Sequence, residues 1–297
     1  MGSHLTEKLI RDGNRVTVID NLAHGKLENL SEISDNKNFS FIKHDIRKPI
    51  KIEGKIDYVC NLACPASPRH YFSIPFETLE TSSIGTRNML LLAQEKKARF
   101  FHTSTSEVYG DPKRHPQSEK YFGNVNPYCL RSCYDEGKRY AEALIYIFRH
   151  KFEVNTGFIR IFNTYGPKMR PDDGRVVSTF IRQALANEDI TIEGTGNQTR
   201  SFCFVSDQIR GIIKMIHSEE EGPINIGNPH EFTIRELAEK VIKLTNSKSK
   251  ITKLPPALSD PKQRRPNIRL ARKKLKWEPK IELDEGLLKT IEWFKKS

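Results

Sequence analysis

The chain has 297 residues, of which 37% are hydrophobic and 29% charged. No apolar run approaches the roughly 18 residues that cross a bilayer, and no N-terminal segment joins a basic stretch to an apolar core and a cleavage site, so we expect a cytoplasmic protein without a membrane partner. Lysine and arginine outnumber aspartate and glutamate by 49 to 37, and the net charge of +12 favours anionic partners.

In the first half, short β-branched runs alternate with longer helical patterns. This alternation predicts an α/β fold in which helices cover both faces of a parallel sheet. The expected strands are residues 15–19, 39–42, 56–62, 99–103 and 156–161, and the expected helices are residues 3–11, 78–97 and 134–151.

The chain changes character after Asn163, where glycine and proline interrupt it repeatedly and shorter elements follow. We therefore expect a nucleotide-binding domain over residues 1–165 and a second lobe over residues 166–297 that is partly interleaved with it. Residues 254–266 contain four prolines and are expected to form a loop that reaches across a cleft.

The densest basic stretch, residues 262–276, is expected to be a solvated helix face. No helix-turn-helix, zinc-finger or aromatic RNA-binding signature accompanies it, so we predict no nucleic-acid partner. The number of cysteines is odd, which favours reduced thiols, and their spacing does not suit zinc, so we predict no metal site. The cysteines are Cys60, Cys64, Cys129, Cys133 and Cys203.

Asp20 follows an expected strand and is itself followed by a polar stretch that ends at Gly25. A carboxylate at this place in a dinucleotide-binding fold accepts hydrogen bonds from ribose hydroxyls and repels a 2′-phosphate, which favours NAD over NADP. On its own, an aspartate after a strand is more often a cap or turn residue.

The glycine-rich turn that normally lies about twenty residues earlier is not represented. Gly2 stands where its last glycine is expected, and the first expected helix starts at once. Gly2-Ser3-His4 also resembles a cloning remnant, but it continues directly into an amphipathic pattern. We therefore expect a natively shortened start that lacks the first strand of the fold.

Tyr134 and Lys138 open an expected helix, and their spacing of four residues places them on one face. An ammonium beside a phenol favours the phenolate and lowers the pKa of the tyrosine, which suits removal of a hydroxyl proton. A second segment, from Thr103 to Gly110, brings hydroxyls and a carboxylate to the carboxyl end of a strand, where α/β proteins bind ligands.

With these two segments together, the chain resembles the UDP-glucuronate decarboxylases, or UDP-xylose synthases, of the extended short-chain dehydrogenase/reductase group. Dehydratases with the same fold typically have an Asp-Glu pair where this chain has Ser106-Glu107, and 4-epimerases lack that pair. The stretches that match the decarboxylases are residues 65–68, 105–112, 115–119, 134–139, 161–164, 174–178, 198–202 and 277–279.

The resemblance implies a Rossmann-type, doubly wound parallel sheet with a smaller α/β substrate lobe. It implies that NAD oxidises carbon 4 of the glucuronate, with Tyr134 as base and Lys138 setting its pKa, and that the keto acid then loses carbon dioxide. Thr105 or Ser106 is expected to hydrogen-bond the developing oxyanion. The resemblance offers Glu107 and Arg264 for protonation and orientation, before NADH reduces the ketone to give UDP-xylose.

The resemblance also implies which residues contact the two ligands, and it implies a homodimer formed through helices 78–97 and 134–151. The expected cofactor contacts are Gly2, Asp20, Asn21, Gly25, Lys26, Asp45, Ile46, Leu62, Ala63, Thr81, Thr103, Tyr134 and Lys138. The expected UDP-sugar contacts are Pro65, Tyr71, Asn163, Arg175, Val177, Gln198 and Arg200.

The chain also departs from the usual pattern of this family. Arg69 replaces proline, Glu80 lysine, Ser82 asparagine, Glu193 tyrosine and Asn267 aspartate. A carboxylate at position 80 repels an anionic sugar by roughly one to several kcal/mol at short range, unless it points away. Two alternatives therefore stay open: another nucleotide-sugar enzyme, either a 4,6-dehydratase or a 4-epimerase, or an inactive homologue that binds the UDP-sugar without a cofactor.

Overall fold

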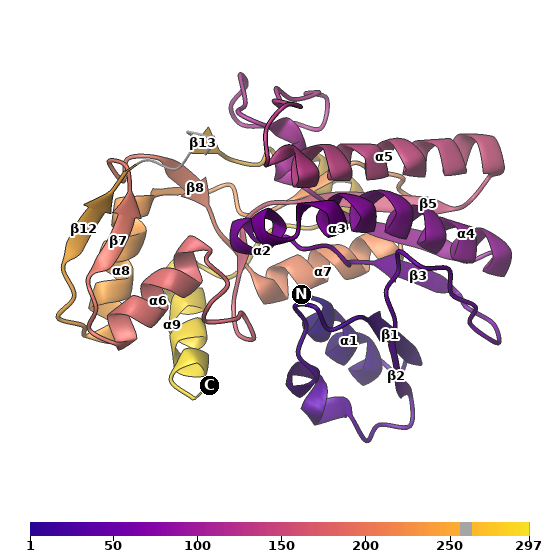
Figure 1. Cartoon of the computed structure of the whole chain (residues 1–297), viewed down its shortest axis with the longest axis horizontal. Coiled ribbons are helices and arrows are strands. Elements are labelled where there is room, and N and C mark those ends of the chain that lie inside the picture. Colours follow the sequence, from indigo (N-terminus) through magenta and orange to yellow (C-terminus); the bar gives the residue numbers. More distant parts are fainter. Residues whose placement is uncertain (256–262, 297) are drawn as a thin grey trace.

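A computed structural model describes residues 1–255 and 263–296 and has the predicted α/β architecture (Figure 1). A four-stranded parallel sheet has the order β10 (Ile224–Ile226), β5 (Thr156–Ile161), β4 (Arg99–Thr105) and β3 (Tyr58–Asn61). A second sheet pairs β1 (Val16–Asp20) in parallel with β2 (Phe39–Lys43), starting with Val16 opposite Phe39. All five predicted strands are present, each within two residues of its expected ends.

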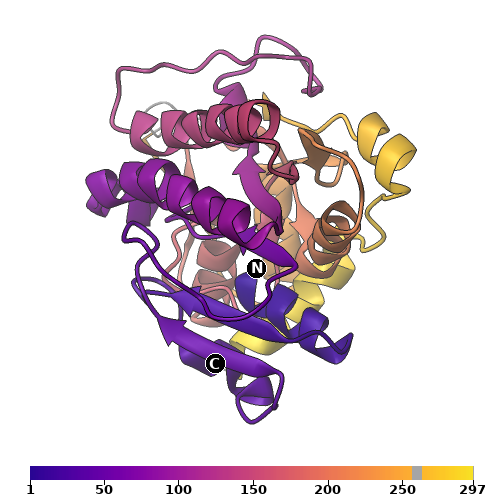
Figure 2. The ribbon, with the colours of Figure 1, turned by 90° about the vertical axis from the view of Figure 1, so that its right-hand side faces the viewer.

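Helices cover both faces of the main sheet, as predicted (Figures 1 and 2). On one face lie α4 (Thr86–Lys96) and α5 (Ser132–Phe152), and on the other lie α1 (Gly2–Arg11) and α7 (Val205–Ile216). The expected helix over residues 78–97 starts earlier than predicted, because Pro75 occupies a first-turn position, where a missing N–H has no cost. This helix consists of α3 (Pro75–Glu80), the π-turn η2 (Thr81–Gly85) and α4.

In the second half of the chain, α6 (Val176–Leu185), α8 (Ile234–Thr245) and α9 (Leu283–Phe294) pack around a parallel strand pair (Figure 1). Thr233 and Glu236 form a reciprocal capping box that fixes the start of α8. The remaining elements are α2 (Pro68–Ser73), η1 (Leu27–Ile33), η3 (Ser106–Tyr109), η4 (Ala271–Leu275), β6 (Thr164–Tyr165), β7 (Ile190–Glu193), β8 (Thr199–Ser201), β9 (Cys203–Phe204), β11 (Glu231–Thr233), β12 (Ile251–Leu254) and β13 (Gln263–Arg264).

The expected loop over residues 254–266 is partly wrong. Residues 256–262 lie outside the described residues, but β13 follows them and pairs in parallel with β8. The expected solvated helix face over residues 262–276 is wrong for Arg264, which is only 5% exposed because β13 packs it against the rest of the molecule. The basic residues of η4, further along, are exposed as predicted.

The largest apolar cluster joins the two lobes, running from Leu5 in α1 through Ile159 in β5 to Leu237 in α8 and Leu287 in α9. A second cluster lies between the main sheet and the helices α4 and α5. The five cysteines are free thiols. In the described part of the chain, no helix is long and apolar enough to cross a membrane.

Candidate active site

The candidate site begins at the carboxyl end of β4, a strand that is buried along its whole length. The chain leaves the sheet through the short helix η3, where the hydroxyl of Thr105 accepts a hydrogen bond from the backbone N–H of Glu107 at 3.2 Å. Gly110 ends this turn with φ of 62°, and a Cβ there would lie 2.1 Å from the carbonyl oxygen of Asn124. The turn therefore holds Thr105, Ser106 and Glu107 in place at the edge of the sheet.

Tyr134 and Lys138 lie on one face of the first turns of α5, and both are buried. The Nζ of Lys138 donates to the carbonyl oxygen of Thr103 at 2.8 Å, and the side chain of Thr105 hydrogen-bonds Tyr134. The ring of Tyr134 stacks on that of Tyr71, with centroids 5.2 Å apart. The start of α5 is thus fastened to the end of β4 by two polar contacts.

Burial dominates the protonation of this pair. It raises the pKa of Tyr134 far above its ordinary value and lowers the pKa of Lys138. In this arrangement the ammonium of Lys138 bonds the backbone carbonyl of Thr103. Ionisation of Tyr134 needs additional positive charge or hydrogen bonds at its oxygen.

Glu107 is enclosed by arginines. Arg264 reaches it from β13, 157 residues away in sequence, with Nη1 donating to Oε1 and Nη2 donating to Oε2 at 2.9 Å. Arg131 donates to Oε2 as well. Burial alone would raise the pKa of Glu107, but Arg264 and Arg131 outweigh it and lower the pKa to about 2. Glu107 is therefore held as a carboxylate, which suits orientation better than the expected proton donation.

Arg131 and Asp135 are site residues that the sequence reasoning missed. Asp135 lies one turn along α5 from Arg131, and its Oδ2 is 3.3 Å from the Nε of Arg131. Burial, with the nearby charge of Glu107, raises the pKa of Asp135 to about 7. The signal in the sequence was that Arg131 and Asp135 are four residues apart, one before and one after Tyr134. This spacing places them on one helix face next to the catalytic turn.

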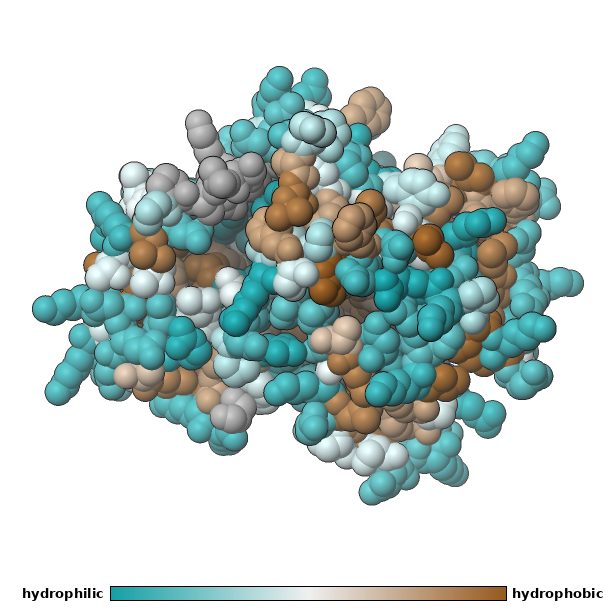
Figure 3. Space-filling view, in the orientation of Figure 1, coloured by the Kyte–Doolittle hydropathy of each residue, from teal (hydrophilic) through white to brown (hydrophobic). Residues whose placement is uncertain are grey.

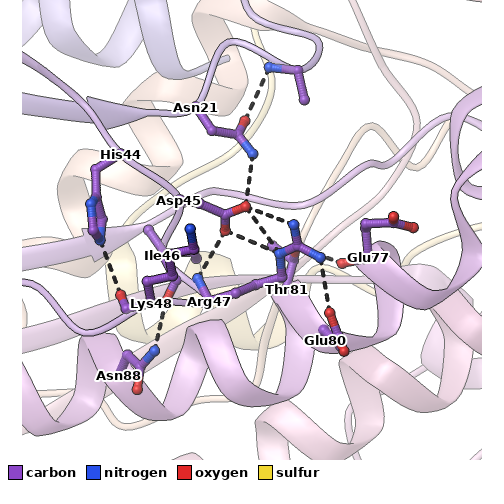
Figure 4. Close-up of polar contacts among 11 residues, drawn as sticks. Asn21, His44, Asp45, Ile46, Arg47, Lys48, Glu77, Glu80, Thr81 and Asn88 are labelled. Carbon is purple, nitrogen blue, oxygen red and sulfur yellow. Dashed lines mark hydrogen bonds and ion pairs between the residues drawn. The ribbon is translucent and has the colours of Figure 1, made fainter.

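The expected cofactor residues gather at the carboxyl ends of β1 and β2 (Figure 4). The carboxylate of Asp20 accepts a hydrogen bond from the N–H of Leu22 at 2.7 Å, and Gly25 closes over it, since a Cβ at Gly25 would lie 2.9 Å from its Oδ2. The amide of Asn21 donates to Asp45 at 3.3 Å, which links the ends of the two strands.

Arg47 connects this strand edge to α3 (Figure 4). Its guanidinium forms a two-pronged contact with Asp45, with Nη2 at 2.8 Å, and its Nη1 donates to Glu80 at 2.9 Å. The hydrogen bonds from Arg47 lower the pKa of Asp45 to about 2. Glu80, the most unusual departure from the family pattern, therefore has its own cation as partner.

The other expected cofactor residues differ in how available their side chains are. Ile46 is 6% exposed and packs in the core beneath Gly85. The hydroxyl of Thr81 donates to the carbonyl of Glu77, one turn earlier in its own helix. Leu62 and Ala63 directly follow β3, and Lys26 is an exposed residue that caps η1. Gly2 begins α1.

Two of the expected UDP-sugar residues lie beside the catalytic cluster. Tyr71 stacks on Tyr134, is 1% exposed, and has a buried hydroxyl without a hydrogen-bond partner among the described residues. Arg200 lies on β8, where its Cα is the register partner of Arg264 on β13, and its positive charge helps to lower the pKa of Glu107. The strand pair β8–β13 thus brings a second arginine to the same carboxylate.

Among the described residues, the other expected UDP-sugar residues make their direct contacts outside this cluster, although the charge of Arg175 acts on Tyr134. Arg175 pairs with Asp173, the amide of Gln198 donates to the carbonyl of Glu193 at 2.8 Å, and the side chain of Val177 belongs to the core. Asn163 accepts the N–H of Cys203 through its backbone carbonyl, and Pro65 follows the end of β3 at the edge of the sheet.

Three further departures from the family pattern have local partners. Arg69 donates to the carbonyl of Asp172 at 3.1 Å. Ser82 is buried, and its hydroxyl lies 3.2 Å from the sulfur of Cys64. Asn267 accepts the N–H of Arg269 at 3.0 Å. Each of these three side chains therefore makes a contact with a nearby protein group.

Comparison with known proteins agrees with this geometry. Residues 1–290 match the family model described as GDP-mannose 4,6 dehydratase. The chain is 49% identical over 294 residues to UDP-glucuronic acid decarboxylase 1 of Danio rerio, covering 99% of this chain and 70% of that protein. It is 51% identical over 288 residues to UDP-glucuronic acid decarboxylase 3 of Arabidopsis thaliana, covering 97% and 84%.

Solved structures of similar fold include two epimerases. UDP-glucose 4-epimerase of Thermotoga maritima, with UDP-glucose, has a TM-score of 0.90 at 28% identity and covers 99% of this chain and 95% of that one. UDP-glucuronic acid 4-epimerase of Bacillus cereus, in complex with UDP-glucuronic acid and NAD, has a TM-score of 0.88 at 27% identity, covering 99% and 96%.

Proposed function

The chain belongs to the GDP-mannose 4,6-dehydratase family, among the UDP-glucuronic acid decarboxylases, and we propose that it converts UDP-glucuronate into UDP-xylose and carbon dioxide with bound NAD. The observation that carries the proposal is the joining of Tyr134 and Lys138 to a β4 edge that ends in Thr105-Ser106-Glu107, with Arg264 on Glu107. A base, hydroxyl donors and arginines then surround one point.

The residues present fit NAD. The first turn of α1 has no acidic residue and its N-cap has no side-chain bond, so its backbone N–H groups suit a pyrophosphate. Asp20 at the end of β1 suits the ribose hydroxyls of NAD. Gly2, Asp20 and Asn21 are the residues that would hold the dinucleotide, with Asp45 behind them. When bound, NAD would supply reversible hydride transfer at carbon 4 of the sugar.

Tyr134 is the proposed base for the hydroxyl on carbon 4. Because burial raises its pKa, the phenol depends on the hydrogen bond from Thr105 and on the nearby ammonium of Lys138 to release its proton. The resulting ketone lies β to the sugar carboxylate, so it can take up the electron pair of the breaking carbon–carbon bond. The hydroxyls of Thr105 and Ser106 are proposed to stabilise the oxyanion that forms.

A homodimer is part of the proposal. Large apolar side chains are exposed on the side of the molecule formed by α3, η2, α4 and α5, and part of this patch is visible in Figure 3. They are Phe76, Leu79, Ile84, Leu91, Tyr140 and Ile147. Two copies packed through these helices would bury the patch in a two-fold symmetric interface. Light scattering should give twice the mass of one chain, and a monomer at micromolar concentration would remove this part of the proposal.

The decisive assay is mass spectrometry of a reaction containing the protein, UDP-glucuronate and NAD. We expect a UDP-pentose and carbon dioxide, a loss of about 100-fold or more in Tyr134→Phe, and near wild-type rates in Tyr146→Phe, a matched change at an exposed position of α5. If an epimer of UDP-glucuronate formed instead, the protein would be a 4-epimerase. If a parallel reaction with UDP-glucose gave a 6-deoxy-4-keto product, it would be a 4,6-dehydratase.

A further inference from the structure

Arg131 contacts two buried carboxylates at once. Its Nη2 donates to Glu107, its Nε is 3.3 Å from Asp135, and its own side chain is 14% exposed. It lies three residues before Tyr134, directly at the start of α5. Arg131 therefore joins the β4 edge to the catalytic turn of α5.

The two arginines on Glu107 come from different parts of the molecule. Arg264 is carried by β13 in the second lobe, whereas Arg131 is carried by the helix that bears Tyr134. A fork from Arg264 alone would fix Glu107 relative to the second lobe only. The bond from Arg131 fixes the carboxylate relative to Tyr134, because three residues of a helix form a rigid spacer.

The charges around this point also depend on Arg131. Asp135 is 5% exposed, and its Oδ1 is buried without a hydrogen-bond partner among the described residues. Its Oδ2 forms an ion pair with Arg131. Without the guanidinium, two carboxylates would share the cluster with the remaining arginines, and like charges in a buried site raise each other's pKa.

We propose that Arg131 is a positioning residue for the decarboxylation, holding the Glu107 carboxylate against Arg264 and engaging Asp135 with the same guanidinium. This role rests on the proposed function. It assigns to Arg131 no contact with the sugar: its effect on the reaction passes through Glu107 and through the placement of Tyr134.

The test compares Arg131→Gln and Arg131→Lys with Arg149→Gln and Arg149→Lys. Arg149 lies on the same helix, away from the site, and pairs with Glu221 at 2.8 Å. We would measure kcat and KM for UDP-glucuronate, the pH profile of kcat/KM from pH 5 to 10, and the melting temperature of each protein.

For Arg131→Gln we expect kcat to fall about 100-fold with KM within about threefold, since orientation rather than ground-state binding is lost. The acid limb of kcat/KM should move up, because Asp135, whose pKa is already raised to about 7, loses the cation that lowers it. Arg131→Lys keeps the charge but not the two-pronged geometry, so it should recover kcat to within about tenfold of the wild type. Both Arg149 variants should resemble the wild type.

The proposal is overturned if Arg131→Gln keeps the wild-type kcat, or if it loses activity equally at every pH with a lower melting temperature and no rescue by lysine. If Arg131→Gln does not fold, Arg131→Lys decides alone: a kcat below the wild type but within about tenfold of it supports the role, and a loss of about 100-fold or more overturns it. Absence of UDP-pentose from the wild type would instead refute the proposed function, and the role of Arg131 with it.

Discussion

Replacing Glu107 with glutamine should destabilise the fold as well as impair the reaction. The side chain of Glu107 is 12% exposed and faces both Arg131 and Arg264. Its pKa falls from 4.5 to about 2 in the folded state, which corresponds to about 3 kcal/mol of stability at pH 7. Glutamine has the same shape but removes the carboxylate that faces the buried guanidinium of Arg264 and leaves Arg131 with Asp135, a change that typically costs about 3–5 kcal/mol.

Urea unfolding of the wild type and Glu107→Gln measures this cost directly, with Glu136→Gln as control because Glu136 forms a half-exposed pair with Arg139 on the same helix. The control should lose no more than about 1 kcal/mol. Because the folded pKa of Glu107 is depressed, its contribution is present above about pH 4.5 and is lost as the pH falls toward 2. The difference in free energy of unfolding between wild type and variant should therefore be constant from pH 7 to pH 5 and become smaller below pH 5. A gap under about 1 kcal/mol at pH 7 would refute the reasoning.

Three further changes test neighbouring parts of the site. Asp135→Asn should stabilise the protein at pH 8 and have much less effect near pH 4. The reason is that the pKa of Asp135 is raised to about 7, so that its ionised form destabilises the fold above its ordinary pKa. A lower melting temperature of the variant at pH 8 would contradict this. Tyr71→Phe removes a buried, unpartnered hydroxyl and should raise stability by about 1 kcal/mol, while a KM for UDP-glucuronate that rises in the same variant would show that the hydroxyl bonds the substrate. Glu80→Gln should cost less than about 1 kcal/mol in urea unfolding and leave that KM unchanged, since the carboxylate faces Arg47; a KM change above threefold would place Glu80 at the sugar.

The parts of the fold that the sequence predicted depend on local patterns. The β-branched run of β1 and the apolar run of β5 identify strands whatever lies around them, and the four-residue spacing of Tyr134 and Lys138 places both on one helix face. The early start of the helix at Pro75 was missed because the prediction relied on apolar spacing and not on the proline that opens the first turn.

Long-range pairs were beyond this reasoning. From the sequence alone, the carboxylate of Glu80 was expected to repel an anionic substrate. In the structure it is paired with Arg47, which lies 33 residues earlier in the chain. Arg264 was expected near the reaction only by resemblance, and a proline-rich stretch was expected to be a loop. Its contact with Glu107 depends on β13 docking on β8, a pairing that no local periodicity reports. Arg131 had a local signal, but an arginine at the start of a helix is usually a surface residue.

The balance of charge around Glu107 gives a physical reason why this site suits an anionic sugar. Arg131, Arg200 and Arg264 act together on one firmly ionised carboxylate, Glu107, while Asp135 changes its charge near neutral pH. When Asp135 is protonated, the two charges of Arg131 and Arg264 exceed the single charge of Glu107, and this excess of positive charge attracts a second carboxylate in a setting where water screens little. A neutral hexose would leave that excess uncompensated, whereas the carboxylate of glucuronate offsets it until carbon dioxide leaves. The same arrangement that holds Glu107 thus favours binding of the sugar acid over binding of the uncharged pentose unit of the product.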